Sequence, residues 1–296
     1  MGSAPQFRDF FDPRTFTITY VLWDADSLEA VIIDPVLDYD PASSTYYFDS
    51  VEPVAQFIDE SQLKVKYILE THAHADHLSG AQEFKRRYSG AQTVIGQKIT
   101  EVQKVFGEIY NLGPRFARDG SQFDILVDEG SHIVFGSFRM GVIHTPGHTP
   151  ACYSFYVADM LFTGDALFMP DFGVGRCDFP GGNANSLYDS VINKLYKLPN
   201  ETRCFTGHDY QPGGREYKCQ STLSEQKKAN VHLPEGRSRE DFIAFRSQRD
   251  AQLKAPRLLL PSIEVNVDGG RLPEPEDNGV SYLKIPIQPQ GEDNAH

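Results

Sequence analysis

A dense group of potential metal ligands in the first third of the chain constrains its fold more than any other feature. Four such residues lie within six positions: His72, His74, Asp76 and His77. Residues 64–69 before them alternate and include β-branched side chains, which predicts a strand, whereas residues 78–87 after them indicate a helix. The four ligands therefore belong to a strand-to-helix loop. Histidines two residues apart in extended chain point the same way, so His72 and His74 can bind one ion together.

Three further candidate ligands follow, each at the end of a predicted strand. His148 lies in Thr-Pro-Gly-His-Thr-Pro, Asp165 in Thr-Gly-Asp-Ala, and His208 in Thr-Gly-His-Asp-Tyr. Strand ends hold ligands rigidly while one side of the metal stays open, which a catalytic site needs and a structural zinc site does not. Taken alone, Asp165 fits an ordinary turn aspartate equally well. The complete set of seven favours its role as a ligand.

The hydrophobic pattern of the rest of the chain predicts a two-part α/β fold. Alternating segments predict strands at 15–23, 30–35, 64–69, 92–95, 123–127, 132–135, 138–144, 152–157, 160–163 and 203–206, and helical periodicity predicts helices at 51–63, 78–87, 99–110, 185–197 and 240–253. Strands followed by helices in two successive halves predict two packed sheets with helices outside. Beyond Gly214 the chain becomes polar, charged and proline-rich. We therefore expect a catalytic domain over 1–214 and an accessory region over 215–296 packed on it.

Composition excludes several classes of partner. The formal net charge of −13 over 296 residues argues against nucleic acid and against anionic membrane surfaces. No apolar run approaches the ~20 residues that a membrane helix needs. The amino terminus lacks the basic and apolar parts of a signal peptide, and the four cysteines show no Cys-x-x-Cys spacing. We expect a cytoplasmic protein with free thiols.

Taken in order, the four ligand motifs resemble those of the metallo-β-lactamase superfamily, from about Phe16 to Tyr210. The resemblance implies an αββα sandwich, in which two mixed β-sheets are flanked by helices and metals lie at one edge of the sheets. Most hydrolases of the superfamily hold two zinc ions. The resemblance then implies that His72, His74 and His148 hold one ion, that Asp76, His77 and His208 hold the other, and that Asp165 bridges them.

Within the superfamily the sequence is more similar to persulfide dioxygenases than to glyoxalase II. The motifs that carry this similarity are Gly-Asp-Ala at 164–166, Gly-Arg at 175–176, His-Asp-Tyr at 208–210 and the short tail. The resemblance implies one Fe(II) per chain, held by His72, His148 and Asp165, with three positions left for water, O2 and substrate. His74, Asp76, His77 and His208 would then orient the ligands or hold a second metal.

The implied reaction oxidises glutathione persulfide with O2 and water to sulfite and glutathione. The alternative is a binuclear zinc hydrolase of the glyoxalase II type that cleaves glutathione thioesters. Seven histidine and aspartate side chains suit either metal, so counting ligands does not decide between them. The oligomeric state also stays open, with a homodimer as one alternative.

Substrate contacts are less constrained by the sequence. Arg176 is a candidate for binding a glutathione carboxylate, but an ion pair with Asp178 or Asp209 explains it equally well. Tyr210 is a second candidate, with simple packing as its alternative, and Arg215 is a third if residues 212–214 turn back. Cys177 is interpreted as a packing residue rather than a redox group. The apolar loop 168–174 is expected beside the substrate entrance, which leaves the thiol carrier open.

Overall fold

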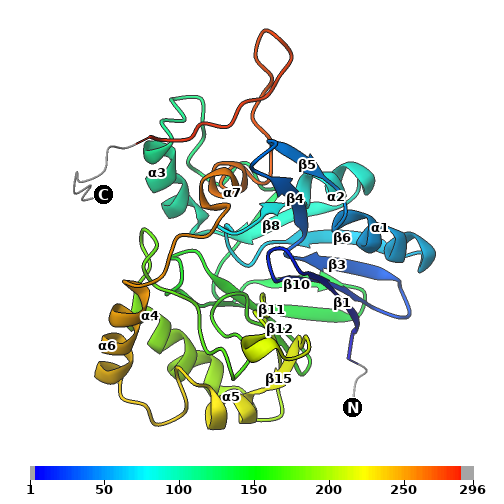
Figure 1. Cartoon of the computed structure of the whole chain (residues 1–296). Helices are drawn as coiled ribbons and strands as arrows, with labels where there is room; N and C mark the ends of the chain where they lie inside the picture. Colours follow the sequence, from blue (N-terminus) through cyan, green and yellow to red (C-terminus); the bar gives the residue numbers. More distant parts are fainter. Residues whose placement is uncertain (1–3, 288–296) are drawn as a thin grey trace.

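The computed structural model describes residues 4–287 and contains two six-stranded sheets packed face to face (Figure 1). The first sheet has the order β1 (Gln6–Asp12), β2 (Thr17–Trp23), β3 (Glu29–Ile33), β6 (Lys64–Leu69), β8 (Gln92–Gly96) and β9 (Ile125–Val127). Its first three strands are antiparallel, and β3, β6, β8 and β9 are mutually parallel. The sheet is mixed, as predicted.

The second sheet is largely antiparallel. Its order is β10 (His132–Phe135), β11 (Phe138–His144), β12 (Tyr153–Val157), β13 (Met160–Phe162), β14 (Arg203–Phe205) and β15 (Gln220–Thr222). Only the β13–β14 pair is parallel. A small third sheet joins β5 (Thr45–Tyr47), β4 (Val36–Asp40) and β7 (Leu78–Ser79).

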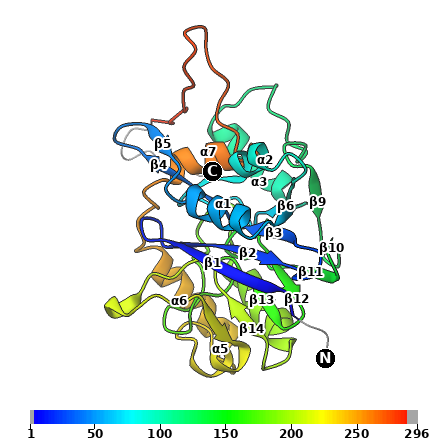
Figure 2. The same cartoon turned by 90° about the vertical axis from the view of Figure 1, so that its right-hand side faces the viewer.

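Helices cover the outer faces of both large sheets, as Figure 2 shows from the side. The helices on the outer face of the first sheet are α1 (Val51–Glu60), α2 (Ala81–Arg87) and α3 (Ile99–Ile109). Those on the outer face of the second sheet are α4 (Ala184–Tyr188), α5 (Leu223–Ala229) and α6 (Arg239–Asp250). Buried Ile18, Tyr20, Phe155 and Phe162 fill the space between the sheets. Burial of this apolar surface stabilises the sandwich by about 25 cal/mol per Å². The αββα class is confirmed.

Several elements differ from their sequence predictions. The predicted helix 185–197 is α4 followed by a π-helical segment, Asp189–Lys194, and a 3₁₀ turn, Leu195–Lys197. The helix predicted from residue 78 begins at Ala81, because Leu78 and Ser79 pair with β4 instead. The predictions also lack β1, β4, β5, β15, α5 and α7 (Leu259–Asn266).

The carboxy-terminal part of the chain packs on the sandwich. β15 extends the second sheet beside β14, α6 contacts α4, and α7 contacts β7. The division at residue 214 stays a prediction, and residues 288–296 of the predicted accessory region lie outside the described residues. Across residues 4–287, no helix is long and apolar enough to cross a membrane.

Candidate metal centre

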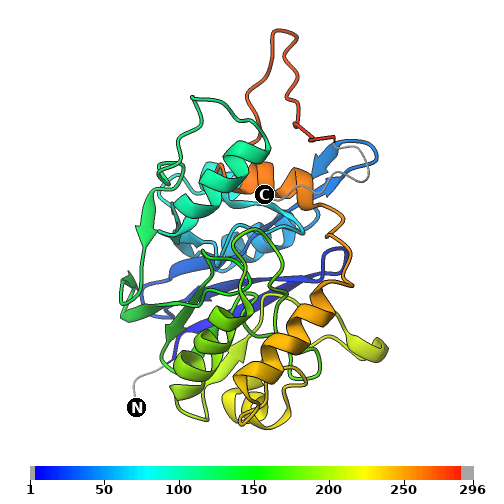
Figure 3. The ribbon, with the colours of Figure 1, turned by 90° about the vertical axis from the view of Figure 1, so that its left-hand side faces the viewer.

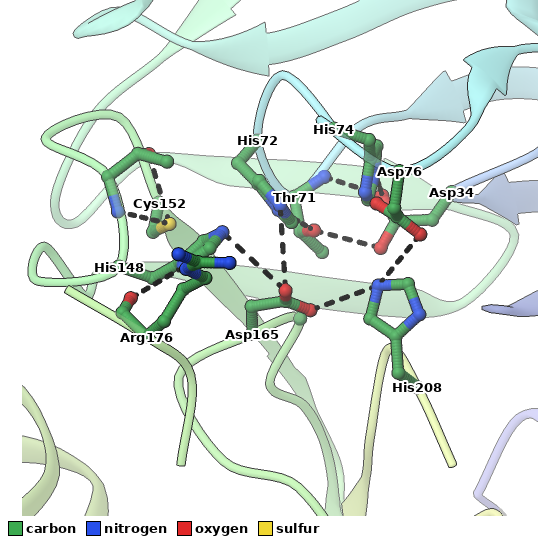
Figure 4. Close-up of polar contacts among 12 residues, drawn as sticks. Asp34, Thr71, His72, His74, Asp76, His148, Cys152, Asp165, Arg176 and His208 are labelled. Atoms are coloured by element: carbon green, nitrogen blue, oxygen red, sulfur yellow. Dashed lines mark hydrogen bonds and ion pairs between the residues drawn. The ribbon is translucent and has the colours of Figure 1, made fainter. Parts of the chain in front are cut away.

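All seven predicted ligands meet at one edge of the two sheets. The loop that holds four of them follows β6, and the other three follow β11, β13 and β14. Figure 4 shows His72, His148 and Asp165 turned toward one another, with His208 on the far side of Asp165. All seven are buried except Asp76, which is partly exposed. Segments far apart in the sequence therefore build one site.

Six of the seven predicted ligands fall into two groups, and His77 belongs to neither. Each of His72, His148 and Asp165 offers one atom, and these atoms lie within 4.8 Å of one another. His148 Nε2 is 3.5 Å and His72 Nε2 4.0 Å from Asp165 Oδ2. His74, Asp76 and His208 form the second group. His208 Nε2 joins the two groups, because it lies 3.3 Å from Asp165 Oδ1.

Several buried polar atoms at this point have no hydrogen-bond partner within residues 4–287. They are His72 Nε2, both ring nitrogens of His74, His77 Nε2, Asp165 Oδ1, His208 Nε2 and Glu70 Oε2. A buried polar atom without a partner costs about 1–3 kcal/mol, and native proteins rarely leave several together. A bound cation satisfies such atoms at once. The donor set of imidazole nitrogens and carboxylate oxygens fits zinc and iron alike.

Hydrogen bonds behind the first group hold its histidines in the metal-binding form. Thr71 Oγ1 donates to Asp34 Oδ2 at 2.8 Å, so it accepts from His72 Nδ1 at 2.9 Å. His148 Nδ1 donates to the carbonyl oxygen of Arg176 at 2.8 Å. Both rings therefore keep the Nε2 lone pair free for a metal, since the proton is on the opposite nitrogen.

Two glycines allow the ligand segments to approach so closely. Gly164 has φ +48°, and a Cβ there would lie 2.6 Å from Thr71 Oγ1. Gly147 has φ +148°, and a Cβ there would lie 2.3 Å from Leu187 Cβ. Any larger residue would push the chain beside Asp165 or His148 away from the site.

Burial and neighbouring charges shift the pKa values of the histidines in different directions. Burial lowers the pKa of His72 well below its ordinary value and also lowers the pKa of His148. Burial opposes charge on His74 as well, but Asp34 and Glu70 outweigh it and raise the pKa of His74 well above its ordinary value. His74 Nε2 lies 3.0 Å from Asp34 Oδ1 and 3.3 Å from Glu70 Oε2. Neutral imidazole is the form that binds metal, so His72 and His148 are the better prepared ligands.

Two residues that the sequence analysis did not single out support the ligand loop. Asn266, at the end of α7, donates through Nδ2 to the carbonyl oxygens of His74 and His77, both at 2.8 Å, and accepts from Ser79 N at 2.8 Å. Thr17 Oγ1 lies 3.3 Å from His77 Nδ1 and 3.4 Å from His208 Nδ1. Neither residue belongs to a motif, so no sequence signal marked them.

A cavity of about 310 Å³ opens onto the first ligand group. Its inner end is lined by Asp76, His148 and Asp165, and its walls include Phe16, Phe168, Phe172, Phe179 and Tyr210. Tyr210 stacks on Phe172 with ring centroids 4.5 Å apart, and on His208 at 5.6 Å. The apolar loop 168–174 therefore borders the cavity, and the volume is at the lower end of the ~300–1,000 Å³ typical of small-molecule sites.

The predicted substrate arginines are both held in ion pairs. Arg176 lines the cavity, but its Nε and Nη2 each lie 2.6 Å from a carboxylate oxygen of Asp178. Arg215 pairs with Asp171 and Asp209 and is not among the residues that line this cavity. The position of Arg215 therefore gives no support to a direct substrate contact.

Cys177 is buried beside the site. Its N–H donates to Asp250 at 2.9 Å, and burial raises the pKa of its thiol to about 12. A thiol that stays protonated is a weak nucleophile, which fits the packing interpretation.

The fold and the site together define a metal-binding protein of a known class. The sequence model of the metallo-β-lactamase superfamily matches residues 13–208. The chain belongs to this superfamily of metal-dependent enzymes.

Its relatives carry two kinds of name. The chain is 49% identical over 288 residues to a probable metallo-hydrolase of Burkholderia pseudomallei, covering 94% of this chain and 97% of that protein. It is 47% identical over 284 residues to a β-lactamase hydrolase-like protein of Xylella fastidiosa, covering 96% of this chain but 65% of that longer protein. It is 36% identical over 234 residues to the mitochondrial persulfide dioxygenase ETHE1 of Mus musculus, covering 78% and 77%.

Among solved structures, the crystal structure of ETHE1 from Myxococcus xanthus is similar with a TM-score of 0.72 and 30% identity. The match covers 90% of this chain and 100% of that chain.

Proposed function

We propose that the protein is an iron-dependent persulfide dioxygenase that acts on glutathione persulfide. The balanced reaction consumes one persulfide, one O2 and one water, and releases one glutathione, one sulfite and two protons. The terminal sulfur is oxidised and its bond to the carrier sulfur is broken. The similarity to persulfide dioxygenases in sequence and fold supports this proposal.

The observation that carries the proposal is the grouping of the ligand atoms. His72, His148 and Asp165 converge without His74. In the two-zinc arrangement His74 shares an ion with His72 and His148, but here it groups with Asp76 and His208 and, separately, with Asp34 and Glu70. Two histidines and one carboxylate form the facial ligand set typical of mononuclear Fe(II) oxygenases.

His72, His148 and Asp165 would hold the iron, which supplies the redox chemistry that O2 requires and zinc lacks. The protein's own contribution is orientation and shielding. The Arg176 carbonyl fixes the ring of His148, and Thr71 with Asp34 fixes the ring of His72. The aromatic walls of the cavity keep bulk water away from the persulfide sulfur.

A second candidate is a binuclear zinc hydrolase that cleaves glutathione thioesters. The second ligand group favours it, because His74, Asp76 and His208 can hold another ion beside Asp165. Relatives named as hydrolases favour it as well. In this arrangement the two ligand groups would hold two zinc ions, which would supply Lewis-acid chemistry for thioester hydrolysis.

Oxygen consumption separates the two candidates. Protein purified without added metal is analysed for metal content, reconstituted with Fe(II) and given glutathione persulfide in an oxygen electrode. The proposal expects one iron per chain, one O2 consumed per sulfite formed, and no sulfite under argon. A His148→Ala variant, treated in the same way, controls for free iron. Two zincs per chain with rapid anaerobic cleavage of S-lactoylglutathione, and no oxygen uptake, would establish the hydrolase instead.

A further inference from the structure

The outer part of the cavity carries positive charge that is only partly held in ion pairs. Six cationic side chains line the cavity: Arg14, Arg176, Arg246, Arg249, Lys254 and Arg257. The first three are paired with Asp38 and Asp49, with Asp178, and with Asp250 respectively. Within residues 4–287, no carboxylate lies within ion-pair distance of Arg249, Lys254 or Arg257.

These three cations lie in one short segment. Arg249 is at the end of α6, and Lys254 and Arg257 are in the coil that leads to α7. Figure 3 shows this segment as an orange trace that runs from α6, on the side of the second sheet, to α7, on the side of the first. Lys254 and Arg257 are exposed, and Arg249 is partly buried.

The lining carboxylates are all at the other end of the cavity. Among the described residues, Asp76 and Asp165 are the acidic side chains that line it, and both belong to the ligand groups. In a protein of net charge −13, three unpaired cations at one cavity mark a place where a ligand supplies the negative charge. Guanidinium groups suit carboxylates in particular, because both are planar and can form two parallel hydrogen bonds.

We infer that Arg249, Lys254 and Arg257 form a carboxylate-binding subsite for the thiol carrier, with its sulfur directed to Asp165 and His148. The carrier is a small thiol with carboxylates remote from its sulfur, and glutathione is the probe that fits this description. Coenzyme A, a thiol that carries phosphates instead of carboxylates, is the comparison probe. This inference rests on the proposed function only for the identity of the carrier, because both candidate reactions use glutathione.

Binding is measured without turnover, so the test is independent of the reaction. Reduced glutathione is titrated calorimetrically into the full-length, metal-loaded protein under argon. The triple variant Arg249→Ala, Lys254→Ala, Arg257→Ala is compared with a control that removes three exposed and unpaired cations elsewhere: Lys104→Ala, Arg115→Ala and Arg139→Ala. We expect the Kd to rise at least tenfold in the first variant and less than twofold in the control.

A chemical counterpart uses the wild-type protein. The diethyl ester of glutathione lacks both carboxylate charges, so it should bind the wild type about as weakly as glutathione binds the triple variant. Equal affinity of the triple variant and the wild type for glutathione would overturn the subsite. So would undiminished affinity for the ester, tighter binding of coenzyme A than of glutathione, or no glutathione binding at millimolar concentration. If these binding results hold while no oxygen is consumed, the dioxygenase fails and the subsite stands.

Discussion

Replacement of Asn266 by alanine tests whether the carboxy-terminal helix holds the metal centre together. Asn266 is 3% exposed and makes three hydrogen bonds of 2.8 Å, two to the ligand loop and one to Ser79 in β7. Alanine leaves two carbonyl oxygens and one N–H buried without partners, each at a cost of about 1–3 kcal/mol. Because carbonyls tolerate this better than N–H groups, we estimate a total loss of about 3–6 kcal/mol in the free energy of unfolding.

Loss of these hydrogen bonds should lower the affinity for metal as well as the free energy of unfolding. Without the hydrogen bonds of Asn266, the ligand loop samples conformations in which His74 and His77 move. Only the fraction of molecules whose loop keeps the native conformation then binds metal. A local cost of about 1.4 kcal/mol lowers metal affinity tenfold. We expect at least this decrease for Asn266→Ala. Asn266→Asp keeps the acceptor for Ser79 N but places a buried carboxylate oxygen against the carbonyl oxygens of His74 and His77, so it should lose at least as much metal affinity as Asn266→Ala.

The assay is retention of metal against chelators of increasing strength, measured by elemental analysis and paired with urea unfolding. Asn230→Ala is the matched control, because Asn230 is 1% exposed and makes several buried hydrogen bonds, to partners such as Gly173 and Leu233 that lie outside the ligand loop. It should lose comparable stability but retain metal as the wild type does. The reasoning fails if folded Asn266→Ala retains metal fully, or if both variants lose it equally.

Three further predictions follow from the same structure. His148→Ala and Asp165→Ala should lose bound iron, whereas His208→Ala should keep most of it; elemental analysis that finds equal loss would contradict a single-iron site. Burial, with three nearby arginines, lowers the pKa of His232 to about 4, so the folded state binds fewer protons than the unfolded state, whose histidine pKa is about 6.5. Stability should therefore fall as pH drops from about 6.5 to 4, and urea unfolding of His232→Asn should show a weaker fall; an identical pH dependence would refute the assignment. Cys177→Ala should keep iron and oxygen uptake within about twofold in the electrode, and a larger loss would indicate a chemical role for the thiol.

Much of the sandwich was predictable because its signals are local. Strand β6 and the ligand loop after it are contiguous in sequence, and strand β11 has the predicted bounds, Phe138–His144. Helix α7 was missed because it is short, contains Pro261 and is largely buried, so it shows no amphipathic period. The π-helical segment after α4 was predicted as ordinary helix, because its apolar residues follow the same pattern as those of an ordinary helix.

The polar contacts were less predictable because they depend on which chain segments meet. Arg176 had two candidate partners in the sequence; in the structure it pairs with Asp178, whereas Asp209 pairs with Arg215. The contact between Asn266 and His77 spans 189 residues and follows no motif. Only the packed structure reveals such pairs, since hydrogen-bonding side chains carry no sequence signal for a remote partner.

The carboxy-terminal region thus meets the site at two places that the experiments can separate. Asn266 contacts the backbone of the ligand loop, whereas Lys254 and Arg257 line the outer cavity. Because α7 begins at Leu259, directly after the cationic segment, deletion of this region would disturb both contacts together. Point variants avoid this: Asn266→Ala should change metal retention and leave glutathione affinity of the metal-loaded form intact, and the cationic triple variant should do the reverse. If each variant altered both quantities, the region would act as one structural support, and neither assignment would hold on its own.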